Sequence, residues 1–306
     1  MLQTMKFDSI LAQASREWSI LASKRPELTE AIALQRRLVN RSIELTKTID
    51  KHPALQFELP PEEVVSRLNK GRPIFSNEEM TLDVTHLRAF ILAFCDDLAE
   101  GGAGKPAQRV RDMLKRGDLE LGSLLAASLM RRLHDIRTTA NHLGVSPDLL
   151  WLVSELSVAP LAYKLQRAHL IDAANTNITI QASLNAWNQG RCPACGSWPA
   201  LAEIVRKMRN LRCSFCGATW QPKKYCCIYC DETGDLFLTT VLSDTEKDKR
   251  RLELCRTCGG YLKSLDVDHT TPFELLAVID LASSDLDAGA VNRGYTRPPM
   301  REFHAT

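Results

Sequence analysis

Helical periodicity runs through the first 185 residues of the sequence. Pro26 stands where a first-turn proline belongs, and apolar residues then recur at roughly helical spacing up to Thr46, at Ile32, Leu34, Leu38, Ile43 and Leu45. The same periodicity, together with turn residues such as Gly144, predicts further helices at 61–68, 107–115, 119–142 and 148–171. We therefore expect a helical bundle at 1–185 in which short loops make neighbouring helices antiparallel.

Another helix is expected after Ser76. Ser76 and Glu79 have the spacing of a capping box, in which each side chain satisfies a backbone N–H at the start of a helix. An apolar stripe comes next, formed by Leu87, Phe90, Ile91, Phe94 and Leu98. Cys95 lies beside this stripe, so we expect it to be a small buried hydrophobic residue.

The pattern changes after residue 172. Residues 172–190 are polar and rich in Asn, Thr and Gln, so we place a domain boundary there, with Trp187 as an anchor for the next domain. Beyond the boundary, short apolar segments flank polar turns at 206–210 and 243–251, a pattern that predicts two β-hairpins. A last helix is expected at 273–286.

These elements predict a fold of the α plus small β class. An N-terminal all-helical domain at 1–185 is followed by two small modules at 186–225 and 226–306, the second of which includes the last helix and the tail. The reason for expecting modules of this kind lies in the cysteines.

Nine of the ten cysteines lie between Cys192 and Cys258. Eight of them form four Cys-X-X-Cys pairs: Cys192/Cys195, Cys213/Cys216, Cys227/Cys230 and Cys255/Cys258. A Cys-X-X-Cys turn, or knuckle, aims two sulfurs at one point, so two knuckles complete a tetrahedral site for zinc or iron. Four knuckles predict two metal sites of the rubredoxin or zinc-ribbon type.

The residue after each knuckle supports this interpretation. It usually needs a positive φ angle, which glycine adopts without steric cost, and Gly196, Gly217 and Gly259 fill three of the four positions. Asp231 fills the fourth, where a short polar side chain is tolerated less well.

The knuckles can pair in sequential or in interleaved order. Sequential pairing closes shorter loops, which loop-closure entropy favours only slightly. The content of the loops is a stronger argument, since each predicted hairpin would lie beside one pair of sequential knuckles. We favour sequential pairing and leave the interleaved alternative open, together with an exchange of Cys226 for its neighbour Cys227.

Composition narrows the class of protein. With 306 residues, 44% hydrophobic and 25% charged, the chain resembles an ordinary globular protein. No signal peptide and no membrane-spanning run are recognisable, which indicates a cytoplasmic protein whose thiols stay reduced and free for metal.

An excess of basic residues in the cysteine region could indicate nucleic-acid binding. Residues 191–263 contain 13 Lys or Arg and 8 Asp or Glu, an excess of +5. Two divalent metals held by four thiolates each would carry −2 apiece, so most of this excess compensates the predicted sites.

No nucleophile with an adjacent base and no cofactor loop can be recognised in the sequence. A metal held by four sulfurs also has no open position for substrate, which favours a binding protein over an enzyme. Two alternatives remain open: an oxidoreductase that uses one Cys-X-X-Cys pair as a dithiol, and a zinc-ribbon protein that binds nucleic acid.

The knuckle region also resembles a known family. The order of Arg191-Cys-Pro-Ala-Cys-Gly-Ser-Trp-Pro, Leu211-Arg-Cys-Ser-Phe-Cys, Cys227-Ile-Tyr-Cys and Cys255-Arg-Thr-Cys-Gly-Gly-Tyr-Leu-Lys263 behind a helical domain is similar to that of the formate dehydrogenase accessory protein FdhE. Asp280-Leu-Ala-Ser, Leu286-Asp287 and Gly294-Tyr295 resemble the C-terminal pattern of the same family.

This resemblance implies a cytoplasmic, non-enzymatic maturation factor, chaperone-like in action, that contacts the catalytic subunit of formate dehydrogenase. It implies two rubredoxin-like metal modules that bind iron or zinc. By position, Cys192, Cys195, Cys213 and Cys216 would form one site, and Cys227, Cys230, Cys255 and Cys258 the other. Neither nucleic acid, nor membrane, nor a small-molecule substrate is expected as a partner.

Overall fold

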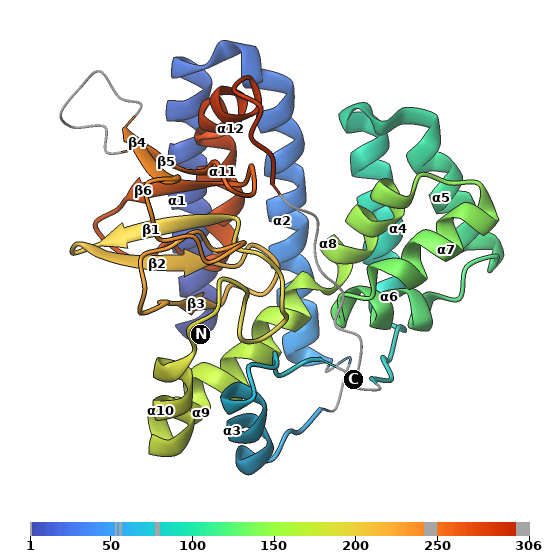
Figure 1. The fold of residues 1–306 in the computed structure, drawn as a ribbon. Coiled ribbons are helices and arrows are strands. Elements are labelled where there is room, and N and C mark those ends of the chain that lie inside the picture. Colours follow the sequence, from blue (N-terminus) through green and yellow to red (C-terminus); the bar gives the residue numbers. More distant parts are fainter. Residues whose placement is uncertain (1, 53, 55–56, 77–79, 242–249, 298–306) are drawn as a thin grey trace. The chain divides into compact units, whose positions relative to one another are not determined.

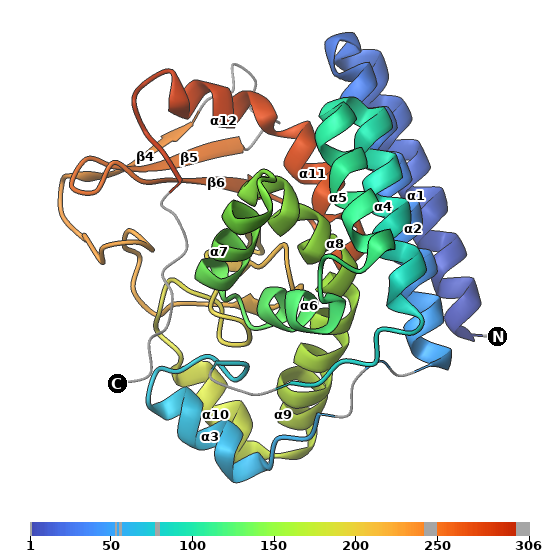
Figure 2. The ribbon, with the colours of Figure 1, turned by 90° about the vertical axis from the view of Figure 1, so that its right-hand side faces the viewer.

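The structure is a computed structural model that describes residues 2–52, 54, 57–76, 80–241 and 250–297. These residues fall into two compact units. Figures 1 and 2 label the helices and strands of which the units are made. The first unit holds the described residues of Met1–Glu58 and Asn77–Leu165, and the second holds those of Leu59–Ser76 and Gln166–Arg301. The domain boundaries expected at 185/186 and 225/226 stay predictions.

The first unit is helical. Its elements are α1 (Leu2–Lys24), η1 (Pro26–Leu28), α2 (Thr29–Lys51), α4 (Leu87–Leu98), η2 (Ala99–Ala103), α5 (Gly104–Arg116), α6 (Leu121–Leu129), α7 (Leu133–Leu143) and α8 (Pro147–Gln166). Helix α2 packs against both α1 and α4. Its buried apolar residues recur at helical spacing, from Ile32 through Leu38 and Ile43 to Ile49.

The predicted helix at 119–142 is two helices in the structure. The chain turns between α6 and α7 at Arg131, which has a φ of 59°. The Arg131 side chain donates a hydrogen bond of 2.8 Å to Glu155 and lies over the ring of Trp151. These contacts with α8 hold the break in place, and periodicity along one segment cannot reveal them.

The prediction that Ser76 caps a helix is also wrong. Helix α4 begins at Leu87, and the Ser76 hydroxyl donates to the carbonyl of Pro73 at 2.6 Å. Glu79 lies outside the described residues. The apolar stripe on α4 is buried as expected, and so is Cys95, whose pKa burial raises to about 12.

The second unit combines helices with a sheet. Its helices are α3 (Pro61–Asn69), η3 (Arg167–Asp172), α9 (Ala173–Thr176), α10 (Ile178–Ala186), η4 (Phe273–Leu275), α11 (Leu276–Ala282) and α12 (Ser284–Val291). The polar segment before the knuckles thus forms α9 and α10, where Asn177 caps α10 by accepting from two backbone N–H groups. The last predicted helix is broken at Ser283.

One sheet joins both knuckle regions. Its strands are β1 (Leu201–Val205), β2 (Met208–Arg212), β3 (Thr219–Trp220), β4 (Phe237–Val241), β5 (Arg250–Cys255) and β6 (Tyr261–Asp266), in the order β3-β2-β1-β6-β5-β4. Strands β1 and β2, and strands β4 and β5, pair antiparallel as the two predicted hairpins. Strands β1 and β6 pair in parallel and join the hairpins. The predicted fold class is confirmed.

The two faces of this sheet differ. One face carries an apolar core shared with α11 and α12, made of Leu201, Leu252, Leu254, Tyr261, Leu265, Leu286 and Ala290. On the other face, Arg209 of β2 donates to Glu253 of β5 across two intervening strands. Three strand spacings span about 14 Å, so these two long side chains reach toward each other across β1 and β6.

Among the described residues, no helix combines the length and the apolar character needed to cross a membrane.

Candidate metal centres

The four knuckles share one backbone geometry. In each, the N–H of the residue after the second cysteine donates to the carbonyl of the first cysteine, at 2.9–3.0 Å, as Gly196 does to Cys192. That residue has a positive φ in every case: 80° at Gly196, 70° at Gly217, 60° at Asp231 and 69° at Gly259. The expected positive φ is confirmed at all four positions, including the one that lacks glycine.

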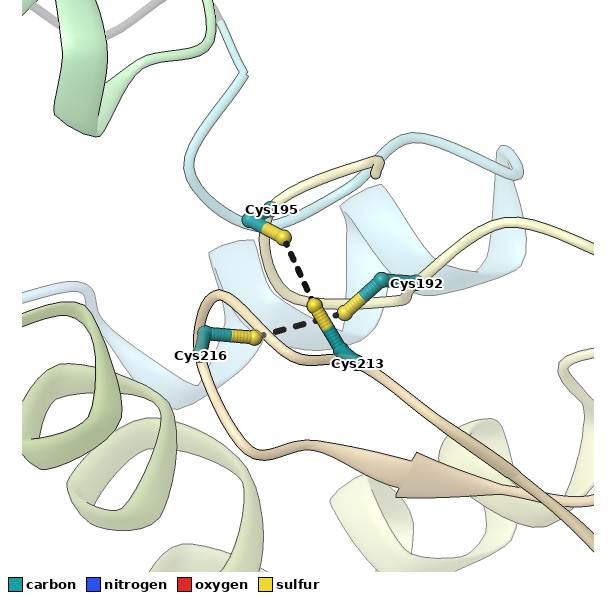
Figure 3. Close-up of side chains that lie close together, drawn as sticks. All are labelled: Cys192, Cys195, Cys213 and Cys216. Carbon is teal, nitrogen blue, oxygen red and sulfur yellow. Dashed lines mark hydrogen bonds between the residues drawn. The ribbon is translucent and has the colours of Figure 1, made fainter. Parts of the chain in front are cut away.

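The eight sulfurs assemble as two groups in sequential order. Cys192, Cys195, Cys213 and Cys216 form centre 1, and Cys227, Cys230, Cys255 and Cys258 form centre 2. Figure 3 shows the four sulfurs of centre 1 pointing toward one another from two loops. In both centres, all four sulfurs lie within 4.8 Å of one another.

The spacing of the sulfurs fits a metal ion. In centre 1 the sulfurs of Cys192 and Cys216 lie 3.5 Å apart, and those of Cys195 and Cys213 lie 3.6 Å apart. In centre 2 the pairs Cys227/Cys258 and Cys230/Cys255 each lie 3.6 Å apart. A tetrahedron with metal–sulfur bonds of about 2.3 Å has edges of about 3.8 Å. Each group can therefore hold one ion of the size of zinc or iron with little movement of the chain.

Centre 1 is buried on all sides. Each of its four cysteines is at most 5% exposed. Burial raises the pKa of the Cys192 and Cys216 thiols well above the ordinary value, and the neighbouring thiols reinforce this. Four thiolates in such surroundings need a cation among them, because otherwise their charges would be desolvated without compensation.

A segment distant in sequence covers the first knuckle of centre 1. The turn that contains Ser76 directs the N–H groups of Ile74 and Phe75 to the carbonyls of Pro193 and Ala194, both at 2.9 Å. The Ile74 and Phe75 side chains are buried. The turn at Ser76, where the sequence predicted a helix cap, thus helps to enclose a metal centre.

Trp187 has the anchoring role expected of it. Its side chain is 2% exposed, and its indole N–H donates to the carbonyl of Arg191, the residue that precedes the first knuckle, at 2.9 Å.

Centre 2 is closed on one side only. Cys227 and Cys255, the first cysteine of each knuckle, are buried, whereas Cys230 and Cys258 are exposed. Burial raises the pKa of Cys227 and, to about 11, that of Cys230. At Cys255 burial acts in the same direction, but hydrogen bonds from the Cys258 backbone and from neighbouring thiols outweigh it and lower the pKa.

The two centres are linked by close packing. The rings of Trp198, behind the first knuckle, and Tyr229, inside the third, meet edge to face with centroids 5.1 Å apart. Gly190 lies so close to the third knuckle that an added Cβ would be 1.9 Å from the carbonyl oxygen of Ile228. Only glycine fits at position 190, because its backbone lies in contact with the backbone of Ile228.

Cys226 belongs to neither group. It is 7% exposed, burial raises the pKa of its thiol, and Cys227 is the neighbour that faces the other three sulfurs of centre 2.

An ion network around the buried Lys263 lies beside centre 2. Lys263, with a fully buried side chain, donates to Asp287 at 2.7 Å and reaches a carboxylate oxygen of Asp280 at the same distance. Asp287 also accepts from Tyr261 and Arg297, both at 2.9 Å. Lys263, Asp280 and Asp287 belong to separate motifs by which the sequence resembles the FdhE family. The fold brings these three residues into one network.

The chain is similar to known proteins. Residues 226–303 match a family model described as FdhE, C-terminal domain. A "Protein FdhE homolog" of Aquifex aeolicus is 24% identical over 304 residues, covering 94% of this chain and 95% of the relative. A "Protein FdhE homolog" of Pseudomonas putida is 36% identical over 121 residues, or 37% of each chain.

The same likeness is visible in three dimensions. The crystal structure of the FdhE protein from Pseudomonas aeruginosa matches with a TM-score of 0.58 at 22% identity, covering 95% of this chain and 94% of that chain. At this identity the match shows a shared fold. Together, the family model, the relatives and the crystal structure confirm the resemblance inferred from the sequence.

Proposed function

We propose that this protein is a non-enzymatic accessory factor needed to assemble active formate dehydrogenase, and that it binds the catalytic subunit of that enzyme in the cytoplasm. The observation that carries this proposal is the similarity to FdhE proteins along 94% of the chain. The cysteine centres support it, because the motifs that build them are those by which the sequence resembles the FdhE family.

Both centres hold metal in this proposal. Cys192, Cys195, Cys213 and Cys216 bind one ion, and Cys227, Cys230, Cys255 and Cys258 bind the other. Zinc or iron would fix the relative position of the knuckles, and iron would also change charge by one electron without a change of ligands. Since four sulfurs fill the coordination shell, neither centre offers a substrate a position on the metal.

The proposal is tested by co-purification. Tagged protein is isolated without oxygen from cells that produce formate dehydrogenase, and the metal content of the same eluate is measured. We expect the catalytic subunit in the eluate, together with about two metal ions per chain, one for each four-sulfur shell. Folded protein loaded with two metals but free of every dehydrogenase subunit would contradict the proposal.

A further inference from the structure

A groove of about 610 Å³ lies beside β2 and β3, and no cysteine lines it. Its apolar lining includes Leu184, Trp220 and Pro222, with Met208 and Tyr225 at the rim. Met208 and Tyr225 are each 54% exposed, although most large apolar residues of the described chain are buried. An exposed apolar patch with polar borders is typical of an interaction site.

Every charged side chain that lines this groove is basic. Arg209, Lys223 and Lys224 contribute to the lining, and no described acidic residue does. Arg209 is held in place by two hydrogen bonds to Glu253, at 3.0 and 2.5 Å, and its guanidinium lies 5.2 Å from the ring centroid of Tyr225. Lys223 and Lys224 are exposed.

Two further basic residues occupy a turn that does not suit them. Arg206 and Lys207 connect β1 to β2 and precede Met208, with φ angles of 49° and 68°. A two-residue hairpin turn with two positive φ angles favours Asn-Gly, because a Cβ atom is strained there, glycine has none, and Asn is tolerated better than most other residues. This turn is therefore less stable than one made of Asn-Gly, and it places two exposed positive charges beside the groove.

We infer that this basic surface, made of Arg206, Lys207, Arg209, Lys223 and Lys224 around the groove, docks an acidic segment of a partner protein that also carries apolar side chains. The inference rests on the proposed function, in which the partner is the catalytic subunit of formate dehydrogenase. Charge complementarity selects the acidic segment, and Met208 and Pro222 accept its apolar side chains.

The surroundings favour a protein over a nucleic acid. The neighbouring cavity on the polar face of the sheet shares Tyr225 with the groove, and charges of both signs line it: Arg206, Lys207 and Arg251 together with Asp266, Asp268 and the buried Glu253. A long phosphate backbone would therefore meet carboxylates as well as cations along this surface, whereas a short acidic segment can end within the groove. Binding of single strands relies on successive exposed aromatic rings that stack on bases. Of the two aromatic residues that line the groove, Trp220 is buried, and Tyr225 alone has an exposed ring.

The first test reverses charge in the groove. Lys223→Glu combined with Lys224→Glu is compared with Lys105→Glu combined with Lys115→Glu, a matched pair of exposed lysines on α5. We expect the groove variant to lose co-purification of the catalytic subunit and the α5 variant to retain it. Retention by a folded groove variant, while the unchanged protein also binds, would overturn the inference and leave the proposed function intact.

A second probe does not depend on the dehydrogenase. A fluorescent peptide of Asp, Glu and Leu is titrated against the full chain, with a single-stranded oligonucleotide in parallel. The groove variant should bind the peptide at least about tenfold more weakly, since like charges would then face each other. Equal peptide affinity for both variants, or tighter binding of the oligonucleotide than of the peptide, would contradict the inference.

The strained turn separates binding from folding. Arg206→Asn combined with Lys207→Gly should raise the melting temperature of the protein, because the new residues suit the turn. The same change should weaken peptide binding, because it removes two positive charges. A merely structural turn would show the first change without the second, and that result would remove Arg206 and Lys207 from the docking surface.

Discussion

Centre 1 and centre 2 are built from the same knuckle, yet centre 1 is enclosed and centre 2 has two exposed cysteines. The backbone hydrogen bonds and φ angles of the four knuckles agree closely. The two centres differ in how far other residues shield their cysteines from solvent. Ile74, Phe75 and Trp187 surround the first knuckle of centre 1, whereas Cys230 and Cys258 face solvent at the edge of centre 2.

This difference separates two tasks that one motif can perform. An enclosed centre exchanges its metal only when the surrounding chain opens, so it acts chiefly as part of the core. A half-exposed centre can lose metal or meet a reagent without such opening. The comparison predicts that damage to centre 1 acts on folding, and that damage to centre 2 acts first on metal content.

The largest expected effect comes from removing one ligand from each centre. Cys213→Ser should unfold the region 190–260 while the helices of the first unit persist, because structural metal sites supply on the order of 10 kcal/mol of folding free energy. Cys258→Ser should leave most of this region folded and lower the metal content by one ion. Limited proteolysis, with fragments identified by mass spectrometry, distinguishes the two results. Protease resistance of 190–260 in Cys213→Ser would contradict the expectation.

A change in the shared sheet should affect both centres. Lys263→Met removes the buried cation from Asp280 and Asp287, which are 43% and 28% exposed and keep Arg297 as a partner, so we expect a cost of about 1.5–3 kcal/mol. Because β6 pairs with β1, chemical denaturation should show earlier loss of metal from both centres. Lys70→Met, at an exposed position in the same unit, serves as control and should change little. Loss confined to centre 2 would show that the sheet does not couple them.

A smaller effect is expected where the chain touches centre 2. Gly190→Ala brings a Cβ against the carbonyl oxygen of Ile228, so the third knuckle must shift, at a cost of about 1–3 kcal/mol. The control Gly234→Ala meets only the flexible Glu232 side chain, at 3.0 Å. Metal release from centre 2 during thermal unfolding should begin earlier in Gly190→Ala alone. Identical release curves for both variants would contradict the close approach.

The smallest effect concerns the knuckle without glycine. Asp231→Gly should stabilise centre 2 by up to about 1 kcal/mol, because glycine adopts the φ of 60° without strain. Gly259→Ala is the reverse experiment at the fourth knuckle and should destabilise centre 2 by a similar amount, since open space surrounds that position and only the φ of 69° opposes a side chain. Urea denaturation measures both, and changes of the same sign would refute the explanation.

Features set by local chemistry were predictable from the sequence. The Cys-X-X-Cys spacing and the glycines after it indicated four knuckles, and apolar segments around polar turns indicated two hairpins. The α2 and α3 helices were also found, since periodicity and Pro26 or Pro61 mark them locally.

Features set by distant contacts were not predictable. The break at Arg131 depends on Glu155 and Trp151, and the role of Ser76 depends on a turn that meets Pro193. The parallel pairing of β1 with β6 joins two hairpins that lie far apart in the sequence, which no local pattern records. The unequal burial of the two centres has the same origin.

The most direct test of this inequality is the rate at which each cysteine reacts in the metal-loaded protein. A time course with iodoacetamide, resolved by peptide mass spectrometry, reports all ten thiols at once, with the buried Cys95 as an internal reference for a closed position. We predict that Cys230 and Cys258 react at least about tenfold faster than the four cysteines of centre 1, which require opening of the surrounding chain. Equal rates in both centres, or faster reaction in centre 1, would contradict the assignment of centre 1 as the enclosed centre and centre 2 as the accessible one.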